Sequence, residues 1–160
     1  MDRLVDVVHI GYPKTGTTTF QLTFSSHRDV ISLGKQPLHL DYRLLVDEFI
    51  GCDPFQFSAE EYRQRFAQLH ERHGVGTRHQ GIRLISHELL CGDVFGGWRA
   101  FILLDRIRET FGEVKILLTI REQKSMLESV YRQYVKGGGA LHIRELLYKR
   151  RSPSVDEWGN

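Results

Sequence analysis

The sequence predicts an α/β protein in which a parallel sheet of about four strands is flanked by helices. Two observations support this fold class. Short apolar runs alternate with helical patterns along the 160 residues, which is typical of strands joined by crossover helices. The runs are also nearly continuous in apolar residues, as in strands that helices cover on both faces. No repeat or low-complexity segment interrupts the alternation, so we expect one domain over residues 1–160.

Four apolar runs are interpreted as strands. Each run is short, rich in Val, Ile or Leu, and bounded by glycine or polar residues. In chain order they cover about residues 4–10, 29–33, 82–86 and 114–120. The fourth run is interpreted as the strongest of the predicted strands.

Five segments carry the apolar spacing and the end signals of helices. They cover about residues 16–26, 58–73, 98–111, 122–136 and 140–150. Ser58 and Glu61 have the spacing of a capping box, which marks the start of the second helix. Gly112 is a suitable residue to end the third. Residues 35–56, which contain Pro37 and Pro54, are predicted to be an irregular excursion over the surface.

Composition narrows the classes of function. The net charge of +2 gives no global attraction for nucleic acid, so we expect no nucleic-acid partner and any anion site must be local. Cys52 and Cys91 have neither zinc nor redox spacing, which favours a reducing compartment. No apolar run approaches the roughly 18 residues of a membrane span, and the N-terminus lacks a signal-peptide core. We therefore expect a cytoplasmic protein without a transmembrane segment.

The segment after the first strand is the most informative part of the chain. It reads Gly11-Tyr-Pro-Lys-Thr-Gly-Thr-Thr-Thr19 and leads into a helix. A glycine-containing turn at a helix N-terminus gathers backbone N–H groups and the positive end of the helix dipole, and hydroxyl groups add donors. Gly11 and Gly16 have the spacing of a Walker loop. Because Thr17 stands where a Walker loop has its lysine, we predict a phosphate-binding loop that lacks the lysine that reaches a γ-phosphate.

A second anion-binding element follows the fourth strand. Ligands of parallel sheets bind beyond the carboxyl ends of the strands, and Arg121 lies at such an end. An arginine can present two parallel donors to a phosphate, and Ser129 lies about two helical turns further on. An arginine in this position is more often a surface ion-pair partner. Together with the first loop, however, it indicates a ligand with two anionic groups.

These two elements resemble those of the PAPS-dependent sulfotransferases. In that family a strand–loop–helix containing Pro-Lys-x-Gly-Thr binds the 5′-phosphosulfate of PAPS (3′-phosphoadenosine 5′-phosphosulfate), and a later arginine and serine bind its 3′-phosphate. Residues 11–18 match the first element almost position by position, and Arg121 and Ser129 match the second. The resemblance implies a P-loop-NTPase-like sulfotransferase fold. It also implies in-line transfer of a sulfuryl group from PAPS to a hydroxyl or amine, with PAP as the product.

The resemblance also implies roles for individual residues. Donor binding is expected from Pro13, Lys14, Thr15, Gly16, Thr17, Thr18, Thr19, Arg121 and Ser129. Lys14 is expected to stabilise the negative charge that develops on the oxygen between phosphate and sulfate. No metal is required in this family, and the sequence has no Asp or Glu cluster suited to Mg²⁺. The acceptor is expected to be a small molecule or a carbohydrate.

A base that takes the acceptor's proton is expected after the third strand. In this family it is a histidine or a glutamate, and here His87 and Glu88 both follow that strand. Alternation along the strand predicts that the two side chains point to different sides. We favour Glu88, whose pKa should rise toward neutrality in a partly desolvated cleft. His87 and His39 are the alternatives, and in a purely structural role one of the two strand-end residues would cap a following helix.

Two other functions stay open. Family members are typically longer and contain a further strand and a late basic loop, neither of which is visible here. We therefore expect a domain that is incomplete at its C-terminus, or a shortened member that binds PAP or a related nucleotide without catalysis. A P-loop kinase or NTPase is the third interpretation. The glycine spacing supports it, and Thr17 and the lack of a Walker-B-like aspartate oppose it.

Overall fold

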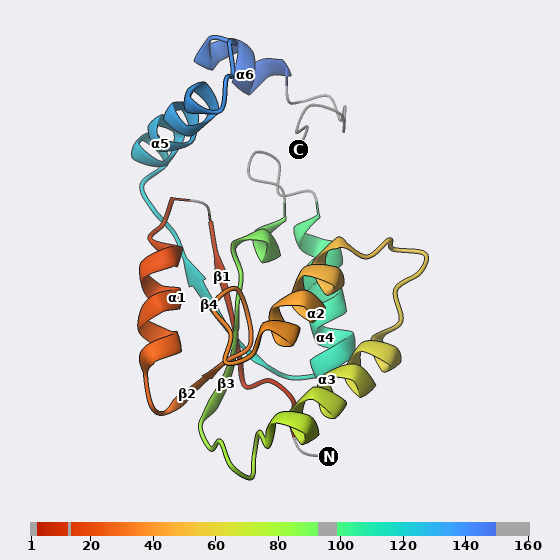
Figure 1. Ribbon diagram of the computed structural model, residues 1–160. Helices are drawn as coiled ribbons and strands as arrows, with labels where there is room; N and C mark the ends of the chain where they lie inside the picture. Colours follow the sequence, from red (N-terminus) through yellow and green to blue (C-terminus); the bar gives the residue numbers. More distant parts are fainter. Residues whose placement is uncertain (1–2, 13, 93–98, 150–160) are drawn as a thin grey trace.

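The computed structural model describes residues 3–12, 14–92 and 99–149. These residues form an α/β domain with one sheet of order β2-β3-β1-β4. The strands are β1 (Val7–Gly11), β2 (Val30–Ser32), β3 (Ile82–Ser86) and β4 (Lys115–Thr119). All three neighbouring pairs are parallel. The predicted class, a parallel four-stranded sheet with flanking helices, is therefore confirmed (Figure 1).

The helices form a layer on each side of the sheet. They are α1 (Thr17–Ser26), α2 (Leu40–Gly51), α3 (Ala59–His73), α4 (Ala100–Phe111), α5 (Gln123–Lys136) and α6 (Ile143–Lys149), with a short 3-10 helix η1 (Glu88–Cys91). Helix α1 lies on one side of the sheet, and α2, α3 and α4 lie on the other (Figure 1). Helices α5 and α6 extend beyond the carboxyl end of β4, away from the rest of the domain (Figure 1).

The hydrophobic core joins the sheet to helices α2, α3 and α4. Val8 and Ile10 of the central strand β1 belong to it. The helices contribute buried side chains at helical spacing, namely Tyr42, Leu45, Val46, Phe49, Ile50, Tyr62, Phe66, Leu69, Leu103 and Ile107. Each large aliphatic or aromatic side chain of this kind contributes about 1.5–3 kcal/mol through its removal from water. The core therefore anchors β1, the strand that leads into the candidate anion loop.

Helix α2 corrects the expectation that residues 35–56 are irregular. Its buried residues recur every three or four positions, which is the apolar stripe of a helix. Pro37 lies before this helix and Pro54 after it, so neither removes a hydrogen bond from its interior. The two prolines therefore flank a helix and do not indicate an irregular segment.

The other elements follow their predicted positions within a few residues. The capping box is confirmed, because the Ser58 hydroxyl accepts a hydrogen bond from the Glu61 N–H at 3.3 Å. The last helix begins at Ile143, somewhat later than predicted. Trp98, the predicted start of the helix that became α4, lies outside the described residues.

Strand β4 departs from the expectation that helices cover every strand. It lies at one end of the sheet order and pairs with β1. Ile116 and Leu118 are 46% and 54% exposed. In β3, Leu84 and Ile85 are each 3% exposed. The apolar sequence of β4 correctly indicated a strand. Its place at the edge does not by itself explain the exposure, because β2 lies at the other edge and its Ile31 is only 5% exposed. The difference is that β2 contributes to the hydrophobic core, and no residue of β4 belongs to it.

In the described part of the chain, no helix is both long enough and apolar enough to cross a membrane. Cys52 is a free cysteine, and Cys91 is buried.

Candidate functional site

The loop after β1 is held in a strained conformation. Gly16, which precedes the first residue of α1, has a φ of 85° in the left-handed region, where a residue without Cβ is favoured. Lys14 has a φ of 67° although it carries a side chain, and such a backbone costs about 1–3 kcal/mol. Strain of this kind persists where the surrounding structure holds a functional segment. Pro13, between Tyr12 and Lys14, lies outside the described residues.

The start of α1 is open to an anion. No side chain within the described ranges caps this helix, and its first turn, Thr17 onward, holds no acidic residue. The first N–H groups of a helix have no partner within the helix, and the dipole makes this end positive. Thr17 is largely buried, while Thr18 and Thr19 are exposed. An anion at this end would therefore meet backbone donors and hydroxyl groups without a competing carboxylate.

Arg121 joins the end of β4 to this loop. Its Nη1 donates to the carbonyl oxygen of Lys14 at 3.0 Å, and its Nε donates to the Ser125 Oγ at 3.2 Å. The two motif segments are 107 residues apart in sequence. In the fold they lie next to each other at the carboxyl edge of the sheet (Figure 1). The structure thus brings together the two elements that the sequence analysis singled out.

Ser125 contacts Arg121, although its spacing from Arg121 does not match the family motif, which points to Ser129. It lies four residues before Ser129 on α5, so both lie on the same face of the helix. Ser129 is half-buried, and among the described residues Arg121 has no hydrogen bond to it. The i, i+4 spacing of the two serines, with Arg121 four residues before the first, is the signal that points to Ser125.

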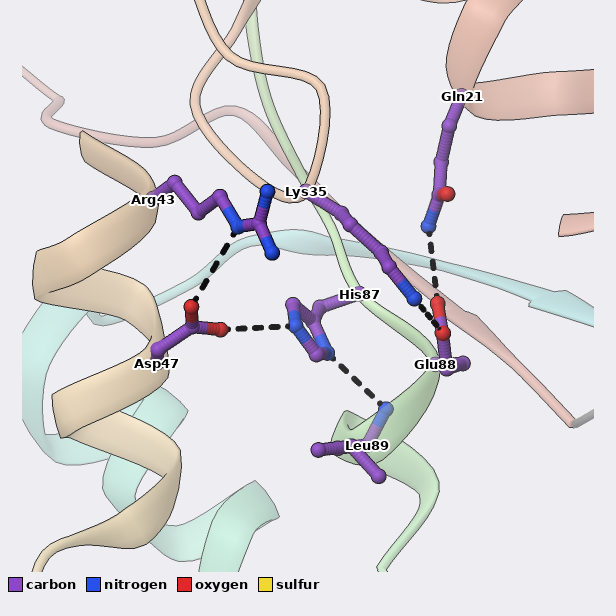
Figure 2. A network of polar contacts seen from close by, with 7 residues as sticks. All are labelled: Gln21, Lys35, Arg43, Asp47, His87, Glu88 and Leu89. Carbon is purple, nitrogen blue, oxygen red and sulfur yellow. Dashed lines mark hydrogen bonds and ion pairs between the residues drawn. The ribbon is translucent and has the colours of Figure 1, made fainter. Parts of the chain in front are cut away.

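Glu88 is held by side chains from two other elements (Figure 2). The Lys35 ammonium contacts its Oε1, and the Gln21 amide of α1 donates to its Oε2 at 3.3 Å. Burial raises the pKa of Glu88, but the hydrogen bonds from Lys35 and Gln21 oppose burial and leave that pKa below its ordinary value. The prediction that its pKa rises toward neutrality is therefore wrong, because a cation and an amide stabilise the charged carboxylate.

Lys35 reaches Glu88 because of a close approach between two segments. A Cβ at Gly34 would lie 2.5 Å from the Ser86 backbone nitrogen, so a residue with a side chain would push the segments apart. The Lys35 N–H donates to the Ser86 carbonyl at 3.0 Å. Glycine at this position therefore lets the loop after β2 run against the end of β3.

His87 points away from Glu88, toward α2 (Figure 2). Its Nδ1 accepts from the Leu89 N–H at 3.1 Å, and its Nε2 lies 3.0 Å from the Asp47 Oδ1. The proton of the neutral ring is therefore on Nε2, which donates to Asp47. Burial lowers the pKa of His87, against the charges of Glu88 and Asp47. The prediction that the two neighbours point to different sides is confirmed, and His87 caps η1.

His39 belongs to a different group of side chains. It precedes α2 and stacks on His73 of α3 with ring centroids 3.8 Å apart. Burial and the neighbouring His73 lower the pKa of His39. Its described contacts connect α2 to the end of α3 and do not include Glu88 or Lys14.

A buried chain of hydrogen bonds lies beneath the loop. The Nδ1 of His9 lies 2.7 Å from the Ser86 Oγ, and its Nε2 lies 3.2 Å from the Thr119 Oγ1. Thr119 in turn lies 3.1 Å from the Thr15 Oγ1, which donates to the Tyr12 carbonyl at 2.6 Å. This chain connects β3, β1 and β4 to the loop that holds Lys14.

The sequence carries weak signals for these supporting residues. His9 is a single ionisable residue within an apolar strand, and it is 1% exposed. Gln21 is 2% exposed and lies one helical turn after Thr17. A polar residue at a buried position of a strand or helix requires a partner, but the sequence alone does not name that partner.

A separate cavity of about 710 Å³ lies near the amino ends of the strands, lined in part by Leu4, His70 and Arg83. Of the polar side chains that line it, Arg83 pairs with Asp6 and His70 lies within hydrogen-bond distance of the Tyr42 hydroxyl. This cavity therefore lies apart from the candidate site.

The described residues form an α/β domain in which the loop after β1, Arg121 and Glu88 all follow the carboxyl ends of parallel strands. In the described ranges, no group of three or more His, Cys, Asp or Glu side chains is arranged to hold a metal ion. Comparisons with protein-family models, with curated proteins and with solved structures found no match.

Proposed function

We propose that this chain is a PAPS-dependent sulfotransferase domain of the P-loop-like type, which transfers a sulfuryl group from PAPS to a hydroxyl or amine. The observation that carries the proposal is the contact between the two motif segments, in which Arg121 Nη1 lies 3.0 Å from the Lys14 oxygen. A nucleotide with anionic groups at both its 5′ and 3′ positions would use both segments. ATP carries all of its phosphates at one end and would use only the first.

The described residues fit such a donor. The uncapped start of α1, with Gly16 before it, suits the 5′-phosphosulfate. Arg121, with Ser125 and Ser129 on one face of α5, suits the 3′-phosphate. When bound, PAPS would supply the sulfuryl group, and the remaining chemistry would belong to the side chains.

Lys14 is proposed to stabilise the charge on the leaving oxygen. Within the described residues no carboxylate pairs with its ammonium group, which leaves this cation available to an anionic ligand. A donor placed at developing charge lowers the activation free energy by about 3–4 kcal/mol. The left-handed backbone at Lys14, with a φ of 67°, is consistent with a residue held for function.

Glu88 is proposed as the base. Because Lys35 and Gln21 offset the effect of burial on its pKa, this carboxylate is ionised at neutral pH and can accept a proton. Its present partners reduce its basicity. In the proposed mechanism the acceptor's hydroxyl or amine therefore takes the place of one of these partners on the Glu88 carboxylate.

The same contacts favour a second candidate function, which is binding of PAP without catalysis. A carboxylate that is already satisfied by Lys35 and Gln21 is a weaker base than a free one. Both candidates share the donor site and differ only in turnover.

Calorimetric titration with PAP tests the donor site, with 5′-AMP and Mg·ATP as controls. We expect PAP to bind without metal and about tenfold or more tightly than 5′-AMP, because hydrogen bonds to a charged group contribute about 1.5–3 kcal/mol. Equal affinity for PAP and 5′-AMP would contradict the proposal. Binding of ATP that requires Mg²⁺ would instead favour an NTPase.

Release of PAP from PAPS then separates the two candidates. The chain is incubated with PAPS and a panel of small-molecule and carbohydrate acceptors that carry hydroxyl or amine groups. Acceptor-dependent release of PAP supports the sulfotransferase. Tight binding of PAP with no release across the panel supports the binding function.

A further inference from the structure

His9 is a buried side chain in the middle of β1, on the side of the sheet that α1 covers. The centroid of its ring lies 5.8 Å from that of Phe20 and 6.1 Å from that of Phe24, both in α1. Burial lowers the pKa of His9, so the ring is neutral at neutral pH and has one donor and one acceptor nitrogen. Its hydrogen bonds therefore have a definite direction.

The hydrogen bonds around His9 can be oriented in one way. The Thr15 hydroxyl donates to the Tyr12 carbonyl, which uses the one hydrogen of that hydroxyl. The Thr15 Oγ1 therefore accepts from the Thr119 hydroxyl, 3.1 Å away, and the Thr119 Oγ1 in turn accepts from the His9 Nε2 at 3.2 Å. The ring proton is thus on Nε2, and Nδ1 accepts from the Ser86 hydroxyl at 2.7 Å.

Gly11, the last residue of β1, leaves the space in which these hydrogen bonds form. A Cβ at this position would lie 2.7 Å from the Thr119 Oγ1 and 2.1 Å from the Thr17 Cγ2. Alanine would therefore displace the Thr119 hydroxyl, which joins His9 to Thr15, or the first residue of α1. A glycine at the end of β1 thus leaves room for the chain of hydrogen bonds.

The chain of hydrogen bonds ends in the turn that carries Lys14. The Tyr12 carbonyl accepts from the Thr15 N–H at 3.2 Å as well as from the Thr15 hydroxyl, so Thr15 closes this turn with two hydrogen bonds. Lys14 has its left-handed backbone within the turn, and such a backbone persists where surrounding contacts hold it. Thr119 and His9 belong to strands that pair with each other, so they connect the turn to the sheet.

We propose that His9 is a positioning residue for the loop after β1, because its Nε2–H holds, through Thr119 and Thr15, the turn that carries Lys14. This inference rests on the proposed function, which supplies the ligand of the loop. His9 is 1% exposed and both of its ring nitrogens have partners within the protein. It therefore acts on a ligand through the loop and not by contact. PAP and 5′-AMP share the 5′ end that the loop would bind, so a loosened turn should weaken both equally.

A matched pair of amides separates the two nitrogens of His9. The amide nitrogen of Gln lies as many bonds from the backbone as the Nε2 of His, and the amide of Asn lies as many bonds from it as the Nδ1. His9→Gln therefore keeps a donor for Thr119 and loses the contact with Ser86, and His9→Asn does the reverse. Titration calorimetry should show nearly wild-type affinities in His9→Gln. In His9→Asn, PAP and 5′-AMP should both bind about tenfold more weakly.

Equal affinities in the two variants would overturn the proposal, as would a loss of the preference for PAP over 5′-AMP in His9→Asn. If the wild-type chain binds neither nucleotide, the proposed function fails, and hydrogen exchange tests the positioning role without a ligand. The Thr15 amide, which donates to the Tyr12 carbonyl, should exchange about tenfold faster in His9→Asn and at the wild-type rate in His9→Gln. The same rate in all three proteins would overturn the role.

Nitrogen NMR of the His9 ring gives a readout that a loss of stability alone does not move. In the wild-type chain the proton of the neutral ring should be on Nε2. Thr119→Val removes the acceptor of this proton and should move it to Nδ1, where it can be donated to the Ser86 Oγ. Ser86→Ala, the matched control, should leave the proton on Nε2. A wild-type ring with its proton on Nδ1 would overturn the proposal.

Discussion

Strands β3 and β4 are similar in sequence and differ in their surroundings. Each is five residues long and mainly aliphatic, and each leads to a candidate site residue. β3 lies between β2 and β1, whereas β4 lies at the sheet edge. Glu88, after β3, is held by side chains from two other elements, while Arg121, after β4, is exposed. The comparison teaches that two strands of similar composition can differ in burial, since β3 contributes Ile85 to the hydrophobic core and no residue of β4 belongs to it.

The largest expected effect is on the stability of the buried strand. Ile85→Ala should lower the free energy of unfolding by about 3 kcal/mol, because it removes a side chain that is 3% exposed. Ile116→Ala, the matched change in β4, should cost less than about 1 kcal/mol. Urea unfolding at low micromolar concentration measures both. Equal losses would show that β4 is covered and would remove the contrast between the strands.

The second-largest effect is expected at Lys14, in the loop that follows β1. Lys14→Ala should reduce turnover about a hundredfold, because a donor at developing charge is lost. Affinity for PAP should fall less, since backbone groups and Arg121 stay in place. Lys124→Ala removes an exposed lysine of α5 and serves as the control. A normal rate of PAP release in Lys14→Ala would exclude this lysine from the mechanism.

A smaller effect is expected at the exposed end of β4. Arg121→Ala should weaken PAP binding about tenfold and reduce the preference for PAP over 5′-AMP, because a charge-assisted bond to the 3′-phosphate is lost. Arg132→Ala on α5, also exposed, should leave the preference unchanged. Titration calorimetry gives both ratios. If Arg121→Ala retains the wild-type preference, the 3′-phosphate is bound elsewhere.

The smallest expected effect is a dependence of the free energy of unfolding on pH, to which the buried residues His9 and His87 contribute. Burial lowers the pKa of His9 and of His87 below the ordinary 6.5. The folded state therefore binds protons less readily than the unfolded state, so acidification through about pH 6.5 favours unfolding. Stability should be fully present above this pH and should fall between pH 7.5 and 5.5, a range in which ordinary carboxylates do not titrate.

His9→Gln tests this contribution. Glutamine does not titrate, so the decrease in unfolding free energy between pH 7.5 and 5.5 should be smaller in the variant than in the wild-type chain. Urea unfolding at the two pH values measures the decrease. A wild-type stability that rises on acidification, or an identical decrease in both proteins, would contradict the assignment.

Local signals in the sequence predicted much of the fold. The apolar runs indicated all four strands, and the capping box at Ser58 located the start of α3. The expectation that His87 and Glu88 point to different sides was correct (Figure 2), although both lie just beyond β3, at the start of η1. Each of these features depends on residues that are neighbours in the chain, which is why the sequence alone can reveal them.

Features that depend on tertiary neighbours were not predicted. The lowered pKa of Glu88 requires Lys35, which reaches it through the close approach at Gly34. The exposure of β4 depends on which elements pack against its faces, and no residue of β4 belongs to the hydrophobic core. Helix α2 was missed for a different reason, since its apolar spacing was present but the flanking prolines were given more weight. Packing between distant segments therefore determines the parts of the site that the motifs do not specify.

The central place of β1 has a consequence for synthesis on the ribosome. β1 is made before the other described strands, yet the partners of its His9 lie 77 and 110 residues later in the chain. Pairings over such separations form slowly, and an unpaired apolar strand is prone to aggregation meanwhile. A nascent chain that has not yet reached Thr119 would contain the loop sequence without a complete β4 to support it. We therefore expect production of the folded domain to benefit from slow expression and from chaperones.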